Sequence, residues 1–274
     1  MLPYIYVFGV TIPMYGLMAV VGFGAAFLLL WFHAKRWGSK RNDVFFAAIY
    51  AIIGAVLGAK LLYLIVDFET VIQYPMAFLR GGAVFYGGVI GGVLGGWIYT
   101  RIYKISFVEV FDTVAPSIAL GHAFGRIGCF CAGCCYGRET DSIFGVVFPE
   151  GSSAPSGVSL LPTQLFESAF LLVLAVVLTI VLRRAKRRGF TAGLYLILYG
   201  AWRIFIECFR ADPRGALLGM STSQFISIFI IAGGILLIIF GDKIAKRENS
   251  RGDWAEEYRA KRQKKQEERG GNGA

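Results

Sequence analysis

The segment GHAFGRIGCFCAGCCYGR at 121–138 places polar side chains inside a stretch that is otherwise apolar. If the segment is helical, His122, Arg126 and Cys129 are spaced i, i+4 and i+7 and share one face. A cation at the centre of a membrane helix costs about 2.5–3.5 kcal/mol, so an arginine kept there usually acts on a substrate or an ion. His122 alone is weaker evidence, because a buried histidine also serves as a hydrogen-bond partner of the backbone.

A second polar face follows in YGAWRIFIECFRADPRG at 199–215, where Arg203, Glu207 and Arg210 have the same spacing. Contact with lipid would be costly for either face, so we expect both to point into a helix bundle and toward each other. Two or three guanidinium groups in such a pocket suit a phosphate, which arginine binds through two parallel hydrogen bonds. Glu207 is the natural partner of Arg203. The alternative is a buried ion pair that only ties two helices together.

The cysteines are concentrated in the first segment. Cys129, Cys131, Cys134 and Cys135 fall within seven residues, and Cys208 follows at a distance. Small apolar packing residues, a disulfide on an oxidising outer face, and a metal site are the three interpretations of this cluster. A metal framework usually pairs a CxxC with distant ligands, and this chain lacks that pattern.

Composition and segment lengths place both polar faces in a membrane protein. Of the 274 residues, 56% are hydrophobic and 17% are charged, too few polar residues to cover the core of a soluble domain. Apolar runs of about 20 residues, which cross a hydrocarbon core of about 30 Å, recur along the chain. The predicted spans are 13–32, 44–66, 83–103, 113–131, 165–182, 192–208 and 223–240. We therefore predict an all-α membrane protein, a bundle of seven transmembrane helices.

Charge placement predicts the orientation of this bundle. Most of the 28 Lys and Arg residues follow the first, third, fifth and seventh spans. The positive-inside rule then puts the N-terminus outside and the C-terminus in the cytoplasm. Residues 1–242 form the transmembrane domain in this prediction, and 243–274 form a charged cytoplasmic tail that is partly disordered. The net charge of +10 is thus a topology signal, and no nucleic-acid partner is expected.

Glycine is abundant and regularly placed. Pairs of glycines repeat every four residues along the third predicted span, and GxxxG patterns occur in the second and fourth; these are Gly87–Gly88, Gly91–Gly92, Gly95–Gly96, Gly54/Gly58 and Gly121/Gly125. Such stripes let helix backbones approach closely in lipid. The alternative is that they leave room for lipid chains.

The longest stretch between predicted spans, at 132–164, contains PEGSSAPSGVSLLP and lies on the outer side in this topology. A loop of this length is often a lid or a recognition element. A tolerated insertion is the alternative.

Several blocks of the sequence carry a family resemblance that covers nearly the whole chain. They are MYGLM at 14–18, GGAVFYGGVIGG at 81–92, HAFGRIGCF at 122–130, GCCYGR at 133–138, PTQLFES at 162–168 and LYLILYGAWRIFIECFRADPRG at 194–215. Together they resemble the phosphatidylglycerol–prolipoprotein diacylglyceryl transferases of bacterial inner membranes. The GRIG block combined with the RxxxE block is specific, although no single piece would suffice.

The resemblance implies an enzyme of the bacterial inner (cytoplasmic) membrane. Such an enzyme transfers the diacylglyceryl group of phosphatidylglycerol to the lipobox cysteine thiol of a preprolipoprotein. A thioether forms and glycerol phosphate leaves. Phosphatidylglycerol, the lipobox peptide and membrane lipid are the expected partners, and no cofactor or metal is expected.

The resemblance also implies roles for individual residues. Arg126 and Arg203 would neutralise charge on the departing phosphate, and Glu207 would orient Arg203. Tyr86 completes the catalytic set. The residues expected to bind or support substrate are Tyr15, Arg126, Cys129, Gly137, Gln164, Glu167 and Arg210. Tyr15 would lie near the phosphate, and Arg210 would contact the head group or the peptide. Gly137 would be needed for its backbone, and Gln164 and Glu167 would support the pocket from the fifth span.

Three positions depart from the family pattern. Well-known members carry a histidine, suggested as the base for the thiol, where this chain has Tyr86, and tyrosine is a poorer base near neutral pH. They often carry asparagine at Cys129 and an acid at Cys134. Either the positive pocket assists thiol ionisation without a dedicated base, or the chain is a diverged paralogue that acts on another acceptor or lipid. A lipid or small-anion transporter is the alternative from another class, but the inverted repeats typical of one are not evident.

Overall fold

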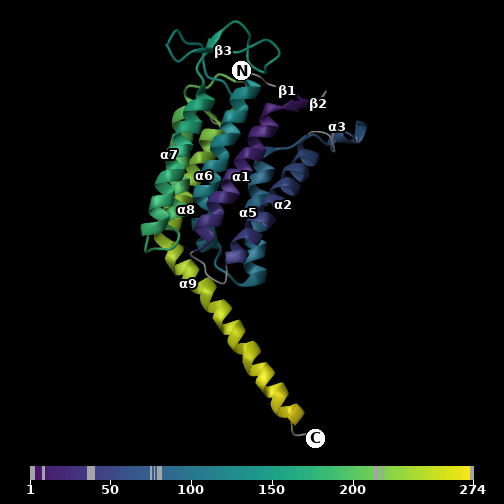
Figure 1. Ribbon diagram of the computed structural model, residues 1–274, viewed down its shortest axis with the longest axis vertical. Helices are drawn as coiled ribbons and strands as arrows, with labels where there is room; N and C mark the ends of the chain where they lie inside the picture. The colour runs from purple at the N-terminus through teal and green to yellow at the C-terminus, as the bar shows by residue number, and fades with distance from the viewer. Residues whose placement is uncertain are drawn as a thin grey trace. The chain divides into compact units, whose positions relative to one another are not determined.

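A computed structural model of the chain describes residues 4–7, 10–35, 41–74, 76, 78, 82–212, 216–217 and 219–271. The described residues are mostly helical (Figure 1). The helices are α1 Met14–Ala34, α2 Arg41–Val66, α3 Phe68–Gln73, α5 Phe85–Tyr103, α6 Phe107–Ala132, α7 Thr163–Arg184, α8 Phe190–Glu207 and α9 Thr222–Gly271. Three short antiparallel ribbons pair β1 Tyr4–Val7 with β2 Val10–Pro13, β3 Val146–Val147 with β4 Ser159–Leu160, and β5 Ala216–Leu217 with β6 Met220–Ser221.

Five of the described helices are long and apolar enough to cross a membrane, namely α1, α2, α6, α7 and the Thr222–Ser250 part of α9. The chain is therefore a multi-pass membrane protein, because helices of this length and composition satisfy their backbone hydrogen bonds internally and expose apolar side chains to lipid. The predicted spans 83–103 and 192–208 form the shorter helices α5 and α8.

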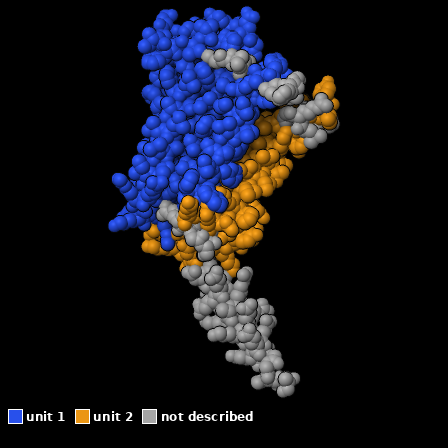
Figure 2. Space-filling model, in the orientation of Figure 1, with its two compact units in different colours: residues 1–33, 111–241 blue, residues 34–110, 242–274 orange. Residues whose placement is uncertain are grey.

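The chain divides into two compact units, shown in separate colours in Figure 2. Unit 1 comprises residues 1–33 and 111–241, and unit 2 comprises residues 34–110 and 242–274. The boundaries fall inside helices, so α6 and α9 each contribute to both units, and the last residue of α1, Ala34, belongs to unit 2. All predicted site residues except Tyr86 belong to unit 1.

The core of unit 1 packs α6 against α7 and α8. Ala115, Ala119 and Ala123 are fully buried and form a small-residue stripe on one face of α6. They contact Leu171, Leu174, Ala175 and Leu178 of α7 and Tyr195 of α8. Small side chains on α6 let the larger side chains of α7 pack closely against its backbone.

A buried carboxylate fixes where α8 begins. Asp112 of α6 accepts hydrogen bonds from the backbone nitrogens of Gly189 at 2.6 Å and Ala192 at 2.8 Å. Gly189 is the N-cap residue of α8 and Ala192 lies in its first turn. Backbone amides at the start of a helix have no hydrogen-bond partner within that helix. Asp112 therefore ties the start of α8 to α6, and the arginines farther along both helices are brought to the same depth of the bundle.

Unit 2 joins α2 and α5 through glycine. A Cβ atom added at Gly54, Gly58, Gly87 or Gly91 would overlap backbone atoms of the facing helix. The predicted close approach of helix backbones is therefore confirmed at this stripe. In unit 1, a Cβ at Gly121 would lie 3.3 Å from Cβ of Ala26 on α1, whereas one at Gly125 would meet no atom of the described residues within 4 Å, so no close approach is seen at Gly125 in this part of the chain.

The long loop between α6 and α7 has a small core of its own. Phe148, Ala154 and Leu160 are buried together, and Phe130 and Tyr136 pack against them. The β3–β4 ribbon pairs Val146 with Leu160 within this loop. An apolar cluster and paired backbone give the loop a defined structure at the end of α6, next to the polar residues.

Candidate functional site

Glu167 of α7 is the centre of the polar cluster in unit 1. Its side chain is fully buried, and its Oε1 lies 3.0 Å from Nη2 of Arg126. This contact is an ion pair without the angular geometry of a hydrogen bond. Oε2 of the same carboxylate lies 3.4 Å from Nη1 of Arg203 and 3.9 Å from Nη1 of Arg210. One carboxylate thus gathers the three arginines that the sequence analysis selected.

Arg203 is held by partners on three helices. Besides Glu167 of α7, its Nη2 lies 2.9 Å from Oε2 of Glu207, four residues farther along α8. The same nitrogen donates a hydrogen bond of 3.1 Å to the hydroxyl of Ser223 on α9. The predicted pairing of Glu207 with Arg203 is therefore present, and the guanidinium plane is fixed from several sides.

Arg210 follows the end of α8 and is held by Asp212. Its Nε and Nη2 donate hydrogen bonds of 3.1 and 3.3 Å to the two carboxylate oxygens of Asp212. Its backbone forms an antiparallel bridge with Gly137 in the loop after α6. This bridge brings the end of α8 to the long loop.

Gly137 is needed at this bridge because of close approach. Its nitrogen donates a 2.9 Å hydrogen bond to the carbonyl of Leu161. A Cβ at Gly137 would lie 2.7 Å from that oxygen and 2.8 Å from Cγ2 of Thr163, distances that real side chains do not reach. Glycine therefore lets the loop pass between α7 and the Arg210 segment.

His122 supports Arg126 one helical turn away. Its Nε2 accepts a hydrogen bond of 3.2 Å from Nε of Arg126, so the proton of the neutral ring is on Nδ1. The ring meets Tyr199 of α8 edge to face, with centroids 5.2 Å apart. His122 thus contacts the guanidinium of Arg126 through a side-chain hydrogen bond.

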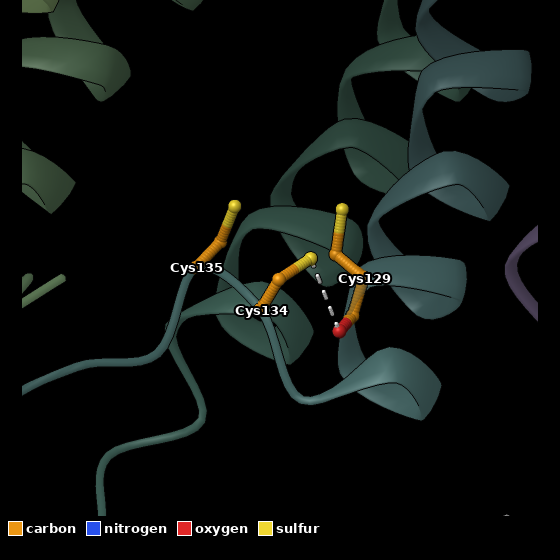
Figure 3. A group of neighbouring side chains, drawn as sticks. All are labelled: Cys129, Cys134 and Cys135. Atoms are coloured by element: carbon orange, nitrogen blue, oxygen red, sulfur yellow. Dashed lines mark hydrogen bonds between the residues drawn. The ribbon is translucent and has the colours of Figure 1, made fainter. Parts of the chain in front are cut away.

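Three cysteines lie beside the arginines. The Sγ atoms of Cys129, Cys134 and Cys135 lie within 4.8 Å of one another, and Figure 3 shows the three side chains pointing the same way. All three are reduced and partly buried. The exposed Cys208 and the neighbouring Cys131 do not belong to this group.

The turn that carries Cys134 and Cys135 is fastened to the start of α7. Nε2 of Gln164 donates a hydrogen bond of 2.8 Å to the carbonyl of Cys134, and the hydroxyl of Thr163 donates one of 2.9 Å to the carbonyl of Cys135. Hydrogen bonds from the Cys129 and Cys134 thiols, together with the nearby Arg210 guanidinium, lower the pKa of the Cys135 thiol below its ordinary value. Gln164 therefore positions this turn.

The two tyrosines of the predicted site have different surroundings. Tyr15, near the start of α1, is half exposed, and its ring packs against Gly128 of α6, where a Cβ would lie 3.2 Å from Cδ2 of the tyrosine. Tyr86 belongs to unit 2, where it is the second residue of α5 and its ring meets Phe85 edge to face.

The cluster can hold an anion without rearranging its own charges. Arg126, Arg203 and Arg210 are matched by Glu167, Glu207 and Asp212, so buried positive charge is compensated before any ligand binds. Among the three arginines, Arg126 keeps the largest exposed side-chain fraction, 12% against 8% and 2%. Fixed guanidinium groups in a buried setting are suited to stabilising charge that develops during a reaction.

Three residues of the polar cluster have a larger role in the structure than the sequence pattern predicts, namely Glu167, Tyr199 and Asp212. Glu167 was expected only as support, yet it is the shared partner of the arginines. Its signal was available, because Gln164, Glu167 and Ser168 share one face of an otherwise apolar helix. Tyr199 and Asp212 carried no comparable signal, since an aromatic residue in an apolar helix and an acid in a turn are common.

Comparison with known proteins identifies the family of this chain. The family model described as prolipoprotein diacylglyceryl transferase matches residues 3–240. Phosphatidylglycerol–prolipoprotein diacylglyceryl transferase 2 of Clostridium perfringens is 44% identical over 234 residues, covering 84% of this chain and 91% of the relative. The phosphatidylglycerol–prolipoprotein diacylglyceryl transferase of Clostridium tetani is 43% identical over 232 residues, covering 84% and 93%.

A relative with lower identity carries the same name. The enzyme of the same name from Pseudoalteromonas atlantica is 34% identical over 238 residues, covering 82% of this chain and 84% of the relative. The matched region contains the helices that carry the arginine cluster. The chain with this buried arginine cluster belongs to the prolipoprotein diacylglyceryl transferase family.

Proposed function

We infer that this chain transfers the diacylglyceryl group of phosphatidylglycerol to a prolipoprotein, the activity named for its relatives. The acceptor in this proposal is the lipobox cysteine thiol, which becomes a thioether while glycerol phosphate leaves. The observation that carries the proposal is the convergence of Arg126, Arg203 and Arg210 on Glu167. A buried cluster of this kind suits a phosphodiester substrate that must be drawn from the membrane.

The arginines act in this proposal on the leaving group. When the carbon–oxygen bond to the phosphate breaks, negative charge increases on the phosphate oxygens. Arg126 and Arg203 neutralise that charge, and Glu207 and Glu167 hold both guanidinium groups in place beforehand. Donors that are already oriented need no reorganisation when the charge develops.

The remaining predicted residues support binding. Arg210, fixed by Asp212, contacts the head group or the incoming peptide, and Tyr15 donates a hydrogen bond to the phosphate. Gly137 and Gln164 keep the loop after α6 against α7, next to Cys129. Each of these roles concerns substrate placement.

Activation of the acceptor thiol needs a further contribution. Tyr86 is the catalytic candidate at the position of the family's histidine, and we propose that its hydroxyl hydrogen-bonds the acceptor. Tyrosine is a poor base near neutral pH, so another group must favour the thiolate. In unit 1, the guanidinium groups of Arg126 and Arg210 are the groups whose hydrogen bonds could favour an anionic form of the acceptor.

The membrane arrangement belongs to the same proposal. Seven spans, with α5 and α8 added to the five long apolar helices, place the N-terminus outside and the tail 243–274 in the bacterial cytoplasm. The arginine cluster then lies toward the outer leaflet of the inner membrane, where a translocated prolipoprotein arrives. Cysteine-accessibility labelling of sites placed in each loop of intact cells tests this orientation.

The direct test is a transfer assay. The purified protein is incubated in phosphatidylglycerol micelles with a lipobox peptide, and both peptide mass and free glycerol phosphate are followed. A diacylglyceryl mass gain matched by glycerol phosphate release is the expected result. If neither product appears while a reference transferase works alongside, the chain acts on another acceptor or lipid.

A further inference from the structure

The three grouped cysteines have the separation of a metal site that is nearly formed. Their sulfur atoms lie within 4.8 Å of one another (Figure 3). In a tetrahedral zinc–thiolate site with Zn–S bonds of about 2.3 Å, sulfur atoms are about 3.8 Å apart. A change of about 1 Å, which side-chain rotation supplies, would bring the three sulfurs to one ion.

The backbone that carries these sulfurs is held in an unusual conformation. Cys135 has φ of 66°, in the left-handed region that few residues other than glycine adopt. Such a conformation costs about 1–3 kcal/mol and persists where the surroundings impose it. Here Gln164 and Thr163 impose it by binding the carbonyls of Cys134 and Cys135. The turn therefore brings its two thiols back toward Cys129 at the end of α6.

The electrostatic setting suits a group with net negative charge. Three thiolates around a divalent cation carry a net charge of −1. Arg126 lies three residues before Cys129 on α6, and the backbone of Arg210 forms a bridge with Gly137, two residues after Cys135. Guanidinium groups placed near the three sulfurs reduce the cost of their negative charge.

We propose that Cys129, Cys134 and Cys135 bind one soft divalent metal ion, of which Zn²⁺ is the representative, through three thiolates. Thiolate sulfur selects soft or borderline ions over magnesium or calcium. Within the part of the chain that the structure describes, no fourth His, Cys, Asp or Glu atom belongs to the group. One coordination position is therefore open, as in catalytic zinc sites. This inference departs from the expectation of no metal in the sequence analysis.

The open position suits the acceptor thiol, a step that rests on the proposed function. On binding, the thiol releases its proton to solvent and its sulfur coordinates the ion as a thiolate. The sulfur electron pair then forms the bond to the glyceryl carbon. The carbon–oxygen bond breaks toward the phosphate, and glycerol phosphate leaves with that electron pair. The ion keeps its three cysteine ligands and its oxidation state throughout.

Metal binding is tested with Co²⁺, whose spectrum reports thiolate coordination. The full-length protein, purified in detergent with a thiol-free reductant and stripped with a chelator, is titrated with Co²⁺. We expect saturation at one equivalent, with the charge-transfer and visible bands of tetrahedral thiolate coordination, and displacement by Zn²⁺. Absence of these bands in the unmodified protein would overturn the proposal, and so would a disulfide among the three residues that survives the reductant.

Cysteine variants assign the ligands. Cys134→Ser is nearly isosteric and should remove the thiolate bands, whereas Cys131→Ser and Cys208→Ser serve as matched controls and should keep them. Bands that survive in the Cys134→Ser protein, or that disappear in the Cys131→Ser protein, would assign the metal to other residues.

The open position is tested with two peptides in the absence of phosphatidylglycerol. A lipobox peptide should change the Co²⁺ bands, and the same peptide with serine in place of cysteine should not. Identical spectra with both would contradict acceptor binding at the metal.

Transfer activity separates this inference from the proposed function. The metal-free protein should transfer at least about tenfold more slowly than the protein reloaded with Zn²⁺. Full activity without metal would overturn the inference and leave the transferase intact. Loss of transfer in every preparation would count against the proposed function, and the Co²⁺ titration would still decide the metal site.

Discussion

The two units of this protein join their helices in different ways. In unit 2, α2 and α5 meet backbone to backbone at facing glycines, including Gly54 and Gly91. In unit 1, α6, α7 and α8 surround buried charges centred on Glu167. Small residues are sufficient to join helices in lipid. The buried charges of unit 1 are more than helix packing alone needs, and they indicate a role in chemistry in addition to any role in holding the helices.

The largest expected effect comes from removing a charge of unit 1. Arg203→Ala should lower transfer by about 100- to 1,000-fold, the usual effect of deleting one preorganised donor of this kind. The measurement is initial-rate transfer to a lipobox peptide. Arg101→Ala, which removes an exposed arginine of α5 in unit 2, is the matched control and should be nearly neutral. Retained activity in the Arg203 variant would remove the phosphate-neutralising role.

Removing the shared carboxylate should affect stability as well as activity. Glu167→Gln keeps the side-chain shape but leaves Arg126 and Arg203 without their common anion. Breaking a buried ion pair by removing one partner typically costs about 3–5 kcal/mol. Unfolding of the detergent-purified protein, compared with the exposed control Glu150→Gln, measures this loss. Equal stability of the two variants would show that the ionic network does not hold the three helices of unit 1 together.

The glycine contact of unit 2 should be sensitive to one methyl group. Gly91→Ala places a Cβ against the carbonyl of Gly54, and overpacking of this kind costs about 1–3 kcal/mol. Gly88→Ala on the same helix is the matched control, because its Cβ would meet Ala55 and Ala59 only at ordinary contact distances of 3.5 and 3.6 Å. Folded yield and thermal unfolding report the difference, and equal behaviour would contradict close backbone packing.

The smallest expected effect concerns Tyr86. Tyr86→Phe should lower transfer by about two- to tenfold, the value of one neutral hydrogen bond. A loss of about 100-fold or more is the range of general acid–base catalysis and would assign the thiol's proton to this hydroxyl. A parallel measurement on Tyr74→Phe, an exposed tyrosine of the same unit, controls for loss of a phenol.

The helices were predictable because their signal is local. Apolar runs of spanning length located α1, α2, α6, α7 and α9, and the shorter α5 and α8 lie where the pattern predicted helices. Helical spacing also put Arg203 and Glu207 on one face, and the two are in contact. Gly125 shows the limit of such patterns. It completes a GxxxG with Gly121, but no atom of the described residues lies within 4 Å of where its Cβ would be.

The sequence by itself determined which residues bear charge inside apolar helices, which helix faces carry them, and the family to which the chain belongs. These properties depend on composition and on spacing within one helix. Only the tertiary structure decided that Glu167 is the common partner of three arginines and that three of the five cysteines share one location. The arginine contacts depend on which faces of α6, α7 and α8 meet, and the cysteine group depends on how the turn after α6 folds back. Contacts between separate elements are set by packing of the whole unit, so the spacing of residues within one helix does not determine them.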